Sequence, residues 1–307
     1  MSRLFEYLRA LDGDIEHLVA AKVSPSNGAH HDDDASRILS VLHLPHAATP
    51  ALPMITPFRV AAVDLQPQDR VVCLTDPGSP AAHRFRLLRV RLRELQKARS
   101  LKTLLITSAL PQDGKSTVVM NLATALSQQG KHSILVVDGD LHRCSLTQRL
   151  SPRSAGLAEC IARGLDPSAA IHQLQPLGWH FLPAGTPPEN ASELLHNDVV
   201  SGILQKLGPS FDWILLDSPP VAPLADSVSF ARSVDGVLFV MKADSTPKEA
   251  VEDAISLVGK KRVVGVVLNG IQESDHLYHR YSEYYGRGGT KKDPQERPTG
   301  TPTPLST

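Results

Sequence analysis

Short runs of large apolar residues alternate with amphipathic stretches along the middle of the chain. The apolar runs predict buried strands at 101–107, 133–137, 179–182, 213–216, 236–241 and 263–268. Segments with apolar residues at helical spacing separate them, at 80–100, 116–129, 197–207, 227–233 and 247–258. Because parallel strands need crossover connections, this alternation predicts a doubly wound α/β domain, with a mostly parallel sheet and helices on both faces. We expect this domain to span residues 76–272.

The segments on either side of this domain follow other patterns. Residues 4–19 carry apolar side chains at helical spacing and predict a short amphipathic helix, which packs on the main domain or docks on a membrane partner or the bilayer surface. Residues 22–53 have no periodic apolar face, so we expect residues 1–75 to be this helix and a flexible linker. Residues 273–307 predict a flexible tail, too polar and too rich in Pro and Gly to fold, that contains four tyrosines.

Composition excludes several classes of function. Lysine and arginine together number 32, as do aspartate and glutamate, so the chain lacks the overall positive charge typical of nucleic-acid binding. The three cysteines, Cys73, Cys144 and Cys160, are far apart and form no CxxC pair, which argues against a disulfide framework and against a zinc or iron–sulfur site. The sequence has no apolar stretch long enough to span a membrane. We therefore expect a cytoplasmic protein that binds no nucleic acid.

The first predicted strand of the domain runs directly into a turn that contains glycine, and then into a helix. In a phosphate-binding loop, backbone N–H groups and a helix N-terminus converge on anionic oxygens, a lysine reaches the β- and γ-phosphates, and a hydroxyl binds Mg²⁺. Lys115 and Ser116 have these positions, while Ala109 stands where the strict GxxxxGK[ST] pattern has glycine. The alternative is an ordinary strand-to-helix turn with an exposed lysine. The residues expected at the triphosphate are Pro111, Gln112, Asp113, Gly114, Lys115, Ser116 and Thr117.

Three aspartates follow two later strands. Asp138 and Asp140 come after the apolar run ILVV, and Asp217 comes after WILL. The carboxyl ends of parallel strands line the ligand crevice beside the phosphate loop, so these carboxylates should lie near Lys115. We expect Ser116, Asp140 and Asp217 to organise Mg²⁺, and Asp138 to accept the proton of a substrate hydroxyl. Each aspartate alone could instead be a helix cap or a turn residue.

The three motifs share details beyond these minimal patterns. The phosphate loop reads S-x-x-P-x-[DE]-G-K-S-T, the second motif ends in D-x-D-x-x-R, and the third ends in D-[ST]-P-P. Together they resemble the bacterial tyrosine kinases of capsule and exopolysaccharide synthesis. The likeness covers about residues 79–271 and includes Gly185, 190–195, Asp226, 235–236 and 265–269. The resemblance implies a P-loop NTPase fold, ATP and Mg²⁺ as cofactors, and a place for Asn269 at the nucleotide.

The resemblance also implies an activity, that of an ATP-dependent protein-tyrosine autokinase. The family has a C-terminal tyrosine cluster, which here is Tyr278, Tyr281, Tyr284 and Tyr285. These residues would be phosphorylated in trans, and the kinase would regulate the polymerisation and export of exopolysaccharide or capsule. The alternative for the cluster is an aromatic interface patch. The family pattern further implies a separate membrane protein of the polysaccharide chain-length type, which would activate the kinase and hold it at the inner face of the membrane.

One position departs from the kinase pattern, and another departs from the pattern of related ATPases. In the E-x-x-R-x-x-R pattern that is thought to join kinase subunits into a ring, Arg86 and Arg89 are present but His83 replaces glutamate. We expect a homo-oligomer that uses both arginines, with a solvated helix face as the alternative. Cell-division and partition ATPases of this fold have an extra lysine where this chain has Leu110. A positioning or partition ATPase, or a scaffold that binds nucleotide without turnover, is the alternative to a kinase.

Overall fold

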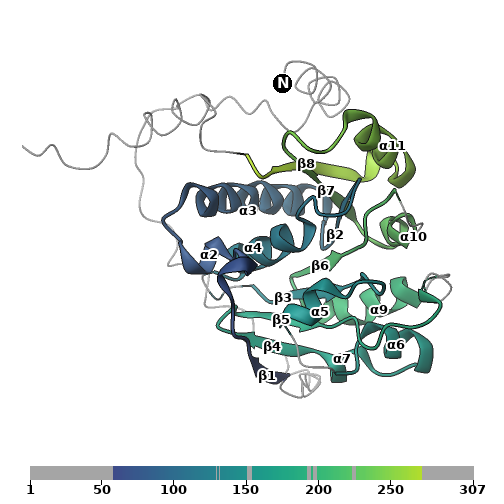
Figure 1. Cartoon of the computed structure of the whole chain (residues 1–307). Helices are drawn as coiled ribbons and strands as arrows, with labels where there is room; N and C mark the ends of the chain where they lie inside the picture. The colour runs from purple at the N-terminus through teal and green to yellow at the C-terminus, as the bar shows by residue number, and fades with distance from the viewer. Residues whose placement is uncertain are drawn as a thin grey trace, which may run out of the picture.

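The computed structural model describes residues 58–128, 130, 132–150, 154–191, 195, 199–222 and 226–271. The strands are β1 (Arg59–Ala62), β2 (Thr103–Ser108), β3 (Ile134–Asp138), β4 (His172–Gln175), β5 (Trp179–Leu182), β6 (Trp213–Asp217), β7 (Gly236–Lys242) and β8 (Val263–Asn269). They form one sheet in the order β1-β4-β5-β3-β6-β2-β7-β8 (Figure 1). All neighbouring pairs are parallel except β4 and β5. The expected doubly wound, mostly parallel sheet is therefore confirmed.

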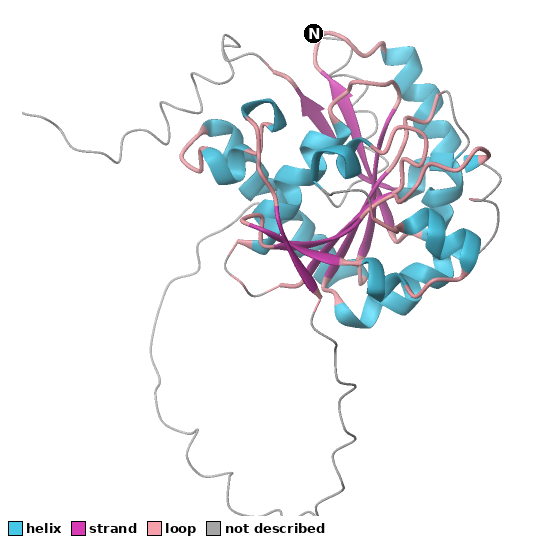
Figure 2. Ribbon diagram, turned by 60° about the horizontal axis from the view of Figure 1, so that its bottom comes forward, coloured by secondary structure: helices cyan, strands magenta, loops and turns pink. Residues whose placement is uncertain are grey.

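Helices cover both faces of this sheet, as Figure 2 shows. The α-helices are α2 (Val72–Thr75), α3 (Pro80–Arg99), α4 (Lys115–Ser127), α5 (Ser145–Leu150), α6 (Leu157–Arg163), α7 (Pro167–Ala170), α9 (Val199–Leu207), α10 (Asp226–Ser233) and α11 (Lys248–Val258). Short 3₁₀ helices span Pro67–Asp69, Gly208–Ser210 and Lys260–Arg262. Side chains of α3 and α4 belong to one hydrophobic cluster, and side chains of α6, α9, α10 and α11 belong to the other.

The central strands supply both clusters, because successive side chains of a strand point to opposite faces. In β2, Leu104 and Ile106 pack in the cluster with α3 and α4, whereas Leu105 packs in the other. β3 and β6 are buried along their whole length. This double burial is why these strands read as uninterrupted apolar runs in the sequence.

The folded domain begins earlier than the expected boundary at residue 76. β1 pairs in parallel with β4 at one edge of the sheet. The side chain of Cys73 is buried, and its backbone N–H donates to Oδ1 of Asn121 in α4 at 3.1 Å. Residues 58–75 are therefore part of the domain and not of a linker. The predicted helix at 4–19 and the four clustered tyrosines lie outside the described residues.

Candidate active site

The phosphate loop joins β2 to α4 through two residues with positive φ. Gln112 has φ of 66° and Gly114 has φ of 95°. A Cβ atom at Gly114 would collide with the side-chain amide of Asn269, so glycine is required for contact as well as for conformation. α4 starts directly after this glycine, which places the positive end of the helix at the loop. The loop thus has the geometry of an anion-binding turn.

Asp113 and Asn269, both expected at the nucleotide, bind the loop itself through their side chains. Oδ2 of Asp113 accepts from the N–H of Leu110 at 3.1 Å, and Oδ1 accepts from the hydroxyl of Thr246 at 2.7 Å. The amide of Asn269, at the end of β8, donates to the carbonyl of Asp113 at 2.9 Å. These contacts fix the loop from the side of β7 and β8. The two side chains are therefore supports of the loop in this arrangement.

Lys115 lies beneath the loop and among the predicted carboxylates. Its side chain is buried, and Nζ donates to the hydroxyl of Ser108 at 3.2 Å. Burial lowers the pKa of Lys115, while the charges of Asp217, Asp140 and Asp113 act in the opposite direction. The structure thus brings the lysine close to the acids of the second and third motifs, as the sequence predicts.

Asp138 and Asp217 are direct neighbours across β3 and β6. Oδ2 of Asp217 accepts from the hydroxyl of Ser116 at 2.8 Å, and Oδ1 is buried without a hydrogen-bond partner among the described residues. Burial, with the nearby charge of Asp138, raises the pKa of Asp217 to about 7 against the effect of Lys115. A buried carboxylate with an unsatisfied oxygen is costly unless a cation or a donor meets it. Asp217 and Ser116 therefore fit a bound Mg²⁺.

Asp140 reaches this place from the loop that follows β3. Its side chain is largely buried, and Oδ1 accepts from the N–H of Arg143 at 3.0 Å. The preceding Gly139 donates its N–H to the carbonyl of Asp217 at 2.8 Å, and a Cβ there would lie 2.7 Å from that oxygen. The glycine thus lets the loop lie directly against the end of β6. A carboxylate from the loop after β3 and one from the end of β6 are brought together in this way.

The role of Asp138 as a proton acceptor stays a prediction, because its carboxylate is occupied by hydrogen bonds within the chain. Its side chain has no exposed surface. Oδ2 accepts from the N–H and the hydroxyl of Thr147, at 2.8 and 2.7 Å, and Oδ1 accepts from the N–H of Asp140 at 3.2 Å. Burial raises the pKa of Asp138 to about 6, although the hydrogen bonds with Thr147 oppose this shift. In this structure Asp138 joins β3 to α5.

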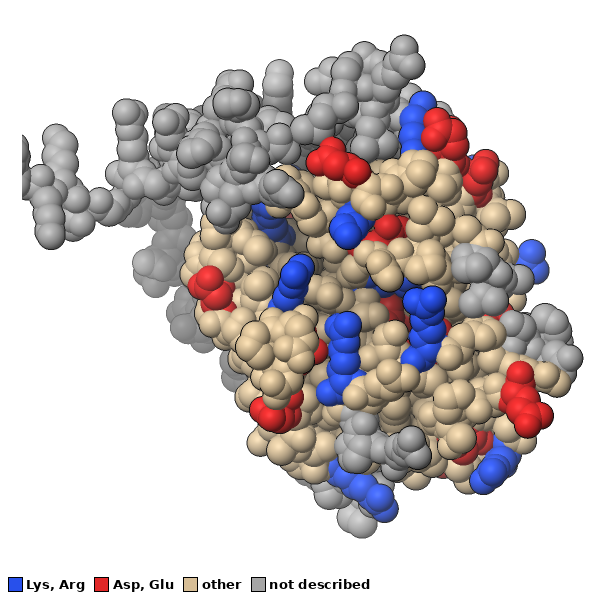
Figure 3. Space-filling model, in the orientation of Figure 1, with Lys and Arg blue, Asp and Glu red and all other residues tan. Residues whose placement is uncertain are grey.

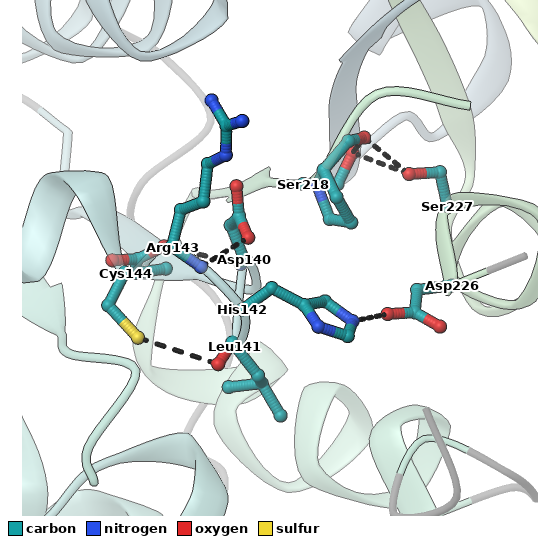
Figure 4. Close-up of polar contacts among 10 residues, drawn as sticks. Asp140, Leu141, His142, Arg143, Cys144, Ser218, Asp226 and Ser227 are labelled. Carbon is teal, nitrogen blue, oxygen red and sulfur yellow. Dashed lines mark hydrogen bonds and ion pairs between the residues drawn. The ribbon is translucent and has the colours of Figure 1, made fainter. Parts of the chain in front are cut away.

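Sequence reasoning missed the polar contacts that hold the loop after β3 and the loop after β6. Nε2 of His142 contacts Oδ2 of Asp226, the first residue of α10, at 2.7 Å (Figure 4). The hydroxyl of Ser227 donates to the carbonyl of Pro219, in the loop after Asp217. Asp226 lies within the region of family likeness, but nothing in the spacing of these residues indicates that they meet. Their contacts depend on how α10 packs against the sheet, where it contacts β2.

The described part of the site holds few possible metal ligands. Among the described residues, no group of three or more histidine, cysteine, aspartate or glutamate side chains could hold a metal ion. Mg²⁺ keeps several waters and takes one or two carboxylates together with substrate phosphates, so it does not require such a group. Ser116, Asp140 and Asp217 supply that smaller set.

Lys and Arg side chains lie singly over much of the face seen in Figure 3. Arg86 donates to the carbonyl of Pro77 at 2.7 Å and Arg89 to that of Ala125 at 2.9 Å. Burial lowers the pKa of Arg89, and the charges of Arg93 and Arg86 add to this. Within the described part of the chain, neither Arg86 nor Arg89 forms an ion pair with a carboxylate.

No described helix has the length and apolar character needed to cross a membrane.

Known proteins resemble this chain in both sequence and fold. Residues 103–253 match the family model of the cellulose biosynthesis protein BcsQ. The putative tyrosine-protein kinase CapB of Staphylococcus aureus is 30% identical over 212 residues, which is 67% of this chain and 92% of CapB. The tyrosine-protein kinase YwqD of Bacillus subtilis is 29% identical over 227 residues, 73% of this chain and 93% of YwqD.

Longer relatives and a solved structure extend this result. The chain spans only 31% of the succinoglycan biosynthesis transport protein ExoP of Rhizobium meliloti, at 29% identity over 245 residues, or 73% of this chain. Among solved structures, the BceF tyrosine kinase domain superposes with a TM-score of 0.60 at 25% identity, covering 66% of this chain and 82% of that domain.

Proposed function

The chain belongs to the bacterial tyrosine-protein kinases of capsule and exopolysaccharide biosynthesis, and we propose that it is an ATP-dependent protein-tyrosine autokinase. The observation that carries this proposal is the unsatisfied, buried oxygen of Asp217 beside Ser116 and Lys115. Burying a carboxylate oxygen without a hydrogen-bond partner lowers the free energy of unfolding. A ligand that binds this oxygen would offset that loss. The sequence relatives named as tyrosine kinases support the same activity.

In the proposed reaction, residues 111–117 bind the triphosphate through backbone N–H groups and the start of α4. Lys115 neutralises charge on the transferred phosphoryl group. Ser116, Asp140 and Asp217 hold Mg²⁺, which would offset the charge of the phosphate oxygens when bound. Asp138 keeps Asp140 in place through its contact with the N–H of Asp140. Asp113 and Asn269 hold the loop in its binding conformation.

The acceptors in this proposal are Tyr278, Tyr281, Tyr284 and Tyr285. Tyr285 follows the last described residue, Ile271, by 14 positions, which corresponds to about 50 Å of fully extended chain. That reach is enough to enter the site of a neighbouring subunit. A tethered substrate also has a high effective concentration, on the order of millimolar, so a weak peptide site suffices.

The test is incubation of the purified chain with ATP and MgCl₂, followed by mass spectrometry of the tyrosine cluster. We expect phosphate on at least one of the four tyrosines, and a decrease of about 100-fold or more in Lys115→Met. Lys206→Met is the matched control, because Lys206 pairs with Asp166 at 2.9 Å on the surface and should have no effect. ATP hydrolysis with an unmodified cluster would favour a positioning or partition ATPase. Nucleotide binding with neither reaction would favour a scaffold.

Transfer in trans is tested by mixing two variants. Lys115→Met supplies intact tyrosines but no activity, and the second variant has an intact site with all four tyrosines changed to phenylalanine. We expect phosphate to accumulate on the Lys115→Met chain only when both are present. An unmodified Lys115→Met chain in the mixture would contradict transfer between subunits.

We propose further that the chain forms a homo-oligomer through the face of α3 that carries Arg86 and Arg89. Both guanidinium groups bond to carbonyls of their own chain but to no described carboxylate, which leaves their charge available to an acidic partner surface. Light scattering on Arg86→Ala and Arg89→Ala should show smaller particles than the wild type.

A membrane protein of the polysaccharide chain-length type is the proposed activator, and through it the kinase would lie at the inner face of the membrane. Addition of its cytoplasmic segment should raise the phosphorylation rate.

A further inference from the structure

The first turn of α10 contacts the loop that carries Asp140 and the loop that follows Asp217, the last residue of β6. Asp226 is 3% exposed, and its Oδ2 contacts Nε2 of His142 at 2.7 Å. His142 lies two residues after Asp140. The next residue of the helix, Ser227, donates to the carbonyl of Pro219 and contacts the hydroxyl of Ser218 at 3.3 Å. One helical turn is thus bonded to the loop after β3 and to the loop after β6.

The side chains of the loop after β3 point in two directions. In Figure 4, the carboxylate of Asp140 and the side chain of Arg143 lie on one side of the loop, and His142 points away from them toward Asp226. His142 is therefore placed to hold the loop rather than to meet a substrate or a cation. The bond is strong for its kind, because a short contact with a buried carboxylate loses little to solvent.

We propose that His142, Asp226 and Ser227 form a clamp that sets the separation of Asp140 and Asp217, with His142 and Asp226 as positioning residues for the divalent cation. This inference rests on the proposed function, since it concerns the same Mg²⁺ site. The three residues are called the α10 clamp below. The hydrogen bond from Gly139 to Asp217 fixes where the two loops begin, but Asp140 lies beyond it. The α10 clamp fixes the loops farther out.

The need for a clamp follows from the chemistry of the cation. Mg²⁺ demands near-ideal octahedral geometry, so small changes in the distance between two ligating carboxylates weaken binding. Groups that orient metal ligands without touching the metal typically change metal affinity by about 10- to 100-fold when removed. Lys115 and the phosphate loop, which would bind the nucleotide, are held by other contacts, with residues of β2 and β8 and with Thr246 after β7. Loss of the clamp should therefore weaken the metal more than the nucleotide.

The experiment compares full-length wild type with His142→Ala, His142→Gln and His132→Ala. His132 is the matched control, because it also faces an aspartate, Asp212, at 3.6 Å and has similar exposure, but lies at the opposite end of β3. Binding of Mn²⁺ to each protein saturated with ADP is measured by electron paramagnetic resonance, and binding of ADP without metal by calorimetry. Thermal unfolding checks that each variant is folded.

We expect His142→Ala to weaken Mn²⁺ by about tenfold and metal-free ADP by less than about twofold. His142→Gln should recover most of the Mn²⁺ affinity, because its amide can still donate to Asp226. His132→Ala should match the wild type. In the kinase assay, the Mg²⁺ concentration for half-maximal rate should rise by the same factor in His142→Ala, with a smaller change in kcat.

Equal Mn²⁺ affinity in His142→Ala and the wild type would overturn the clamp, as would equal losses in the alanine and glutamine variants. Equal losses of Mn²⁺ and of metal-free ADP would also overturn it, because a general disturbance of the site would explain them. A wild type that binds neither ADP nor Mn²⁺ would overturn the proposed function and the clamp together, and so is distinguished from a failure of the clamp alone.

Discussion

Aspartates lie at both ends of the parallel strands, which we call the amino edge and the carboxyl edge of the sheet. The surroundings of these aspartates differ sharply. At the amino edge, Asp235 precedes β7 and is exposed, and its Oδ2 accepts from the N–H groups of Lys102 and Thr103 at 2.9 and 2.7 Å and from the hydroxyl of Thr103 at 2.8 Å. At the carboxyl edge, Asp138 and Asp217 are fully buried with raised pKa values. The first aspartate stabilises the start of a strand. The other two are held in a state that favours their protonation or a bound cation.

The comparison teaches that a carboxylate next to a strand is not by itself a functional group. What distinguishes the carboxyl edge is burial, a lysine within the same site and an oxygen without a partner among the described residues. Functional sites are where a protein tolerates such costs, because the groups are arranged for a ligand and not for folding. Substitutions at the two edges should therefore have opposite effects on stability and activity.

The largest difference is expected between Asp217→Asn and Asp235→Asn. Asp217→Asn should lower phosphotransfer by about 100-fold or more, because a metal ligand is lost. It should also raise the unfolding temperature of the metal-free protein at pH 8, since a neutral amide is cheaper to bury than a carboxylate. Asp235→Asn should keep activity within about twofold and lose about 1 kcal/mol of stability, because its hydrogen bonds are no longer charge-assisted.

Kinase assays and thermal unfolding of the two variants test this pair. Asp217→Asn with normal activity would remove the carboxylate from the proposed metal site. A lower unfolding temperature in Asp217→Asn than in the wild type would show that this carboxylate serves the fold, as Asp235 does.

Glycines at the two edges give the next comparison. At Gly139, a Cβ would lie 2.7 Å from the carbonyl of Asp217 and 3.0 Å from Cδ1 of Leu216, so Gly139→Ala must displace the loop that carries Asp140. We expect about a tenfold loss of activity and a loss of about 1–3 kcal/mol in stability from overpacking. Gly208 leads toward β6 at the amino edge, and a Cβ there would meet no described atom within 4 Å. Gly208→Ala should be neutral or stabilising by up to about 1 kcal/mol.

Activity and urea unfolding of both variants are the measurements. If Gly139→Ala kept full activity, close approach of the loops after β3 and β6 would not be needed for the reaction. Destabilisation by Gly208→Ala would mean that the amino edge is as tightly constrained as the carboxyl edge.

The sequence predicts the central strands of the sheet well and the outer strands β1 and β4 poorly. All six apolar runs are strands, because strands buried on both faces need continuous apolar residues. β1 and β4 were not predicted, since Arg59–Ala62 is mostly exposed and His172–Gln175 buries only Leu174 fully. Without an apolar pattern, such strands are specified by pairing with β5 and with each other, which is a tertiary property.

The candidate site is predictable to the same degree. The phosphate loop, Asp140 and Asp217 follow from strand ends that must meet at one edge of a parallel sheet. The enclosure of Asp138 depends on Thr147 in α5, and the position of Asp140 depends on contacts that start from α10. Side chains of this kind meet only after helices pack on the sheet. Sequence spacing therefore indicates the proposed ligating groups but not the residues that hold them.

A smaller effect concerns the pH dependence of stability. The pKa values of Asp138 and Asp217 are raised to about 6 and about 7 from 3.8. Between these limits the folded protein retains protons that the unfolded chain has lost, so the free energy of unfolding falls as the pH rises. The destabilisation is absent below about pH 4 and complete above about pH 7. Burial lowers the pKa of His172 and of His180, which acts in the opposite direction below pH 6.5.

The difference between the wild type and Asp217→Asn isolates the carboxylate from these histidines. We expect the variant to gain on the order of 2 kcal/mol over the metal-free wild type as the pH rises from 5 to 8. Urea unfolding followed by the fluorescence of the buried Trp179 and Trp213 measures both proteins. Parallel pH profiles would show that Asp217 is not the buried acid that titrates in this range.

The smallest effect should come from the amino end of the strand that carries Asp217. Asp212 precedes β6, is exposed, and accepts from the N–H of Ser133 at 2.7 Å. Asp212→Asn should lose less than about 1 kcal/mol of stability, because solvent screens the exposed charge and the amide oxygen still accepts. ADP and Mn²⁺ affinities should stay within twofold of the wild type. Four buried residues of β6 separate Asp212 from Asp217. A larger change in Mn²⁺ affinity would therefore show that the strand transmits strain from one edge to the other, and the two edges would then not be functionally separate.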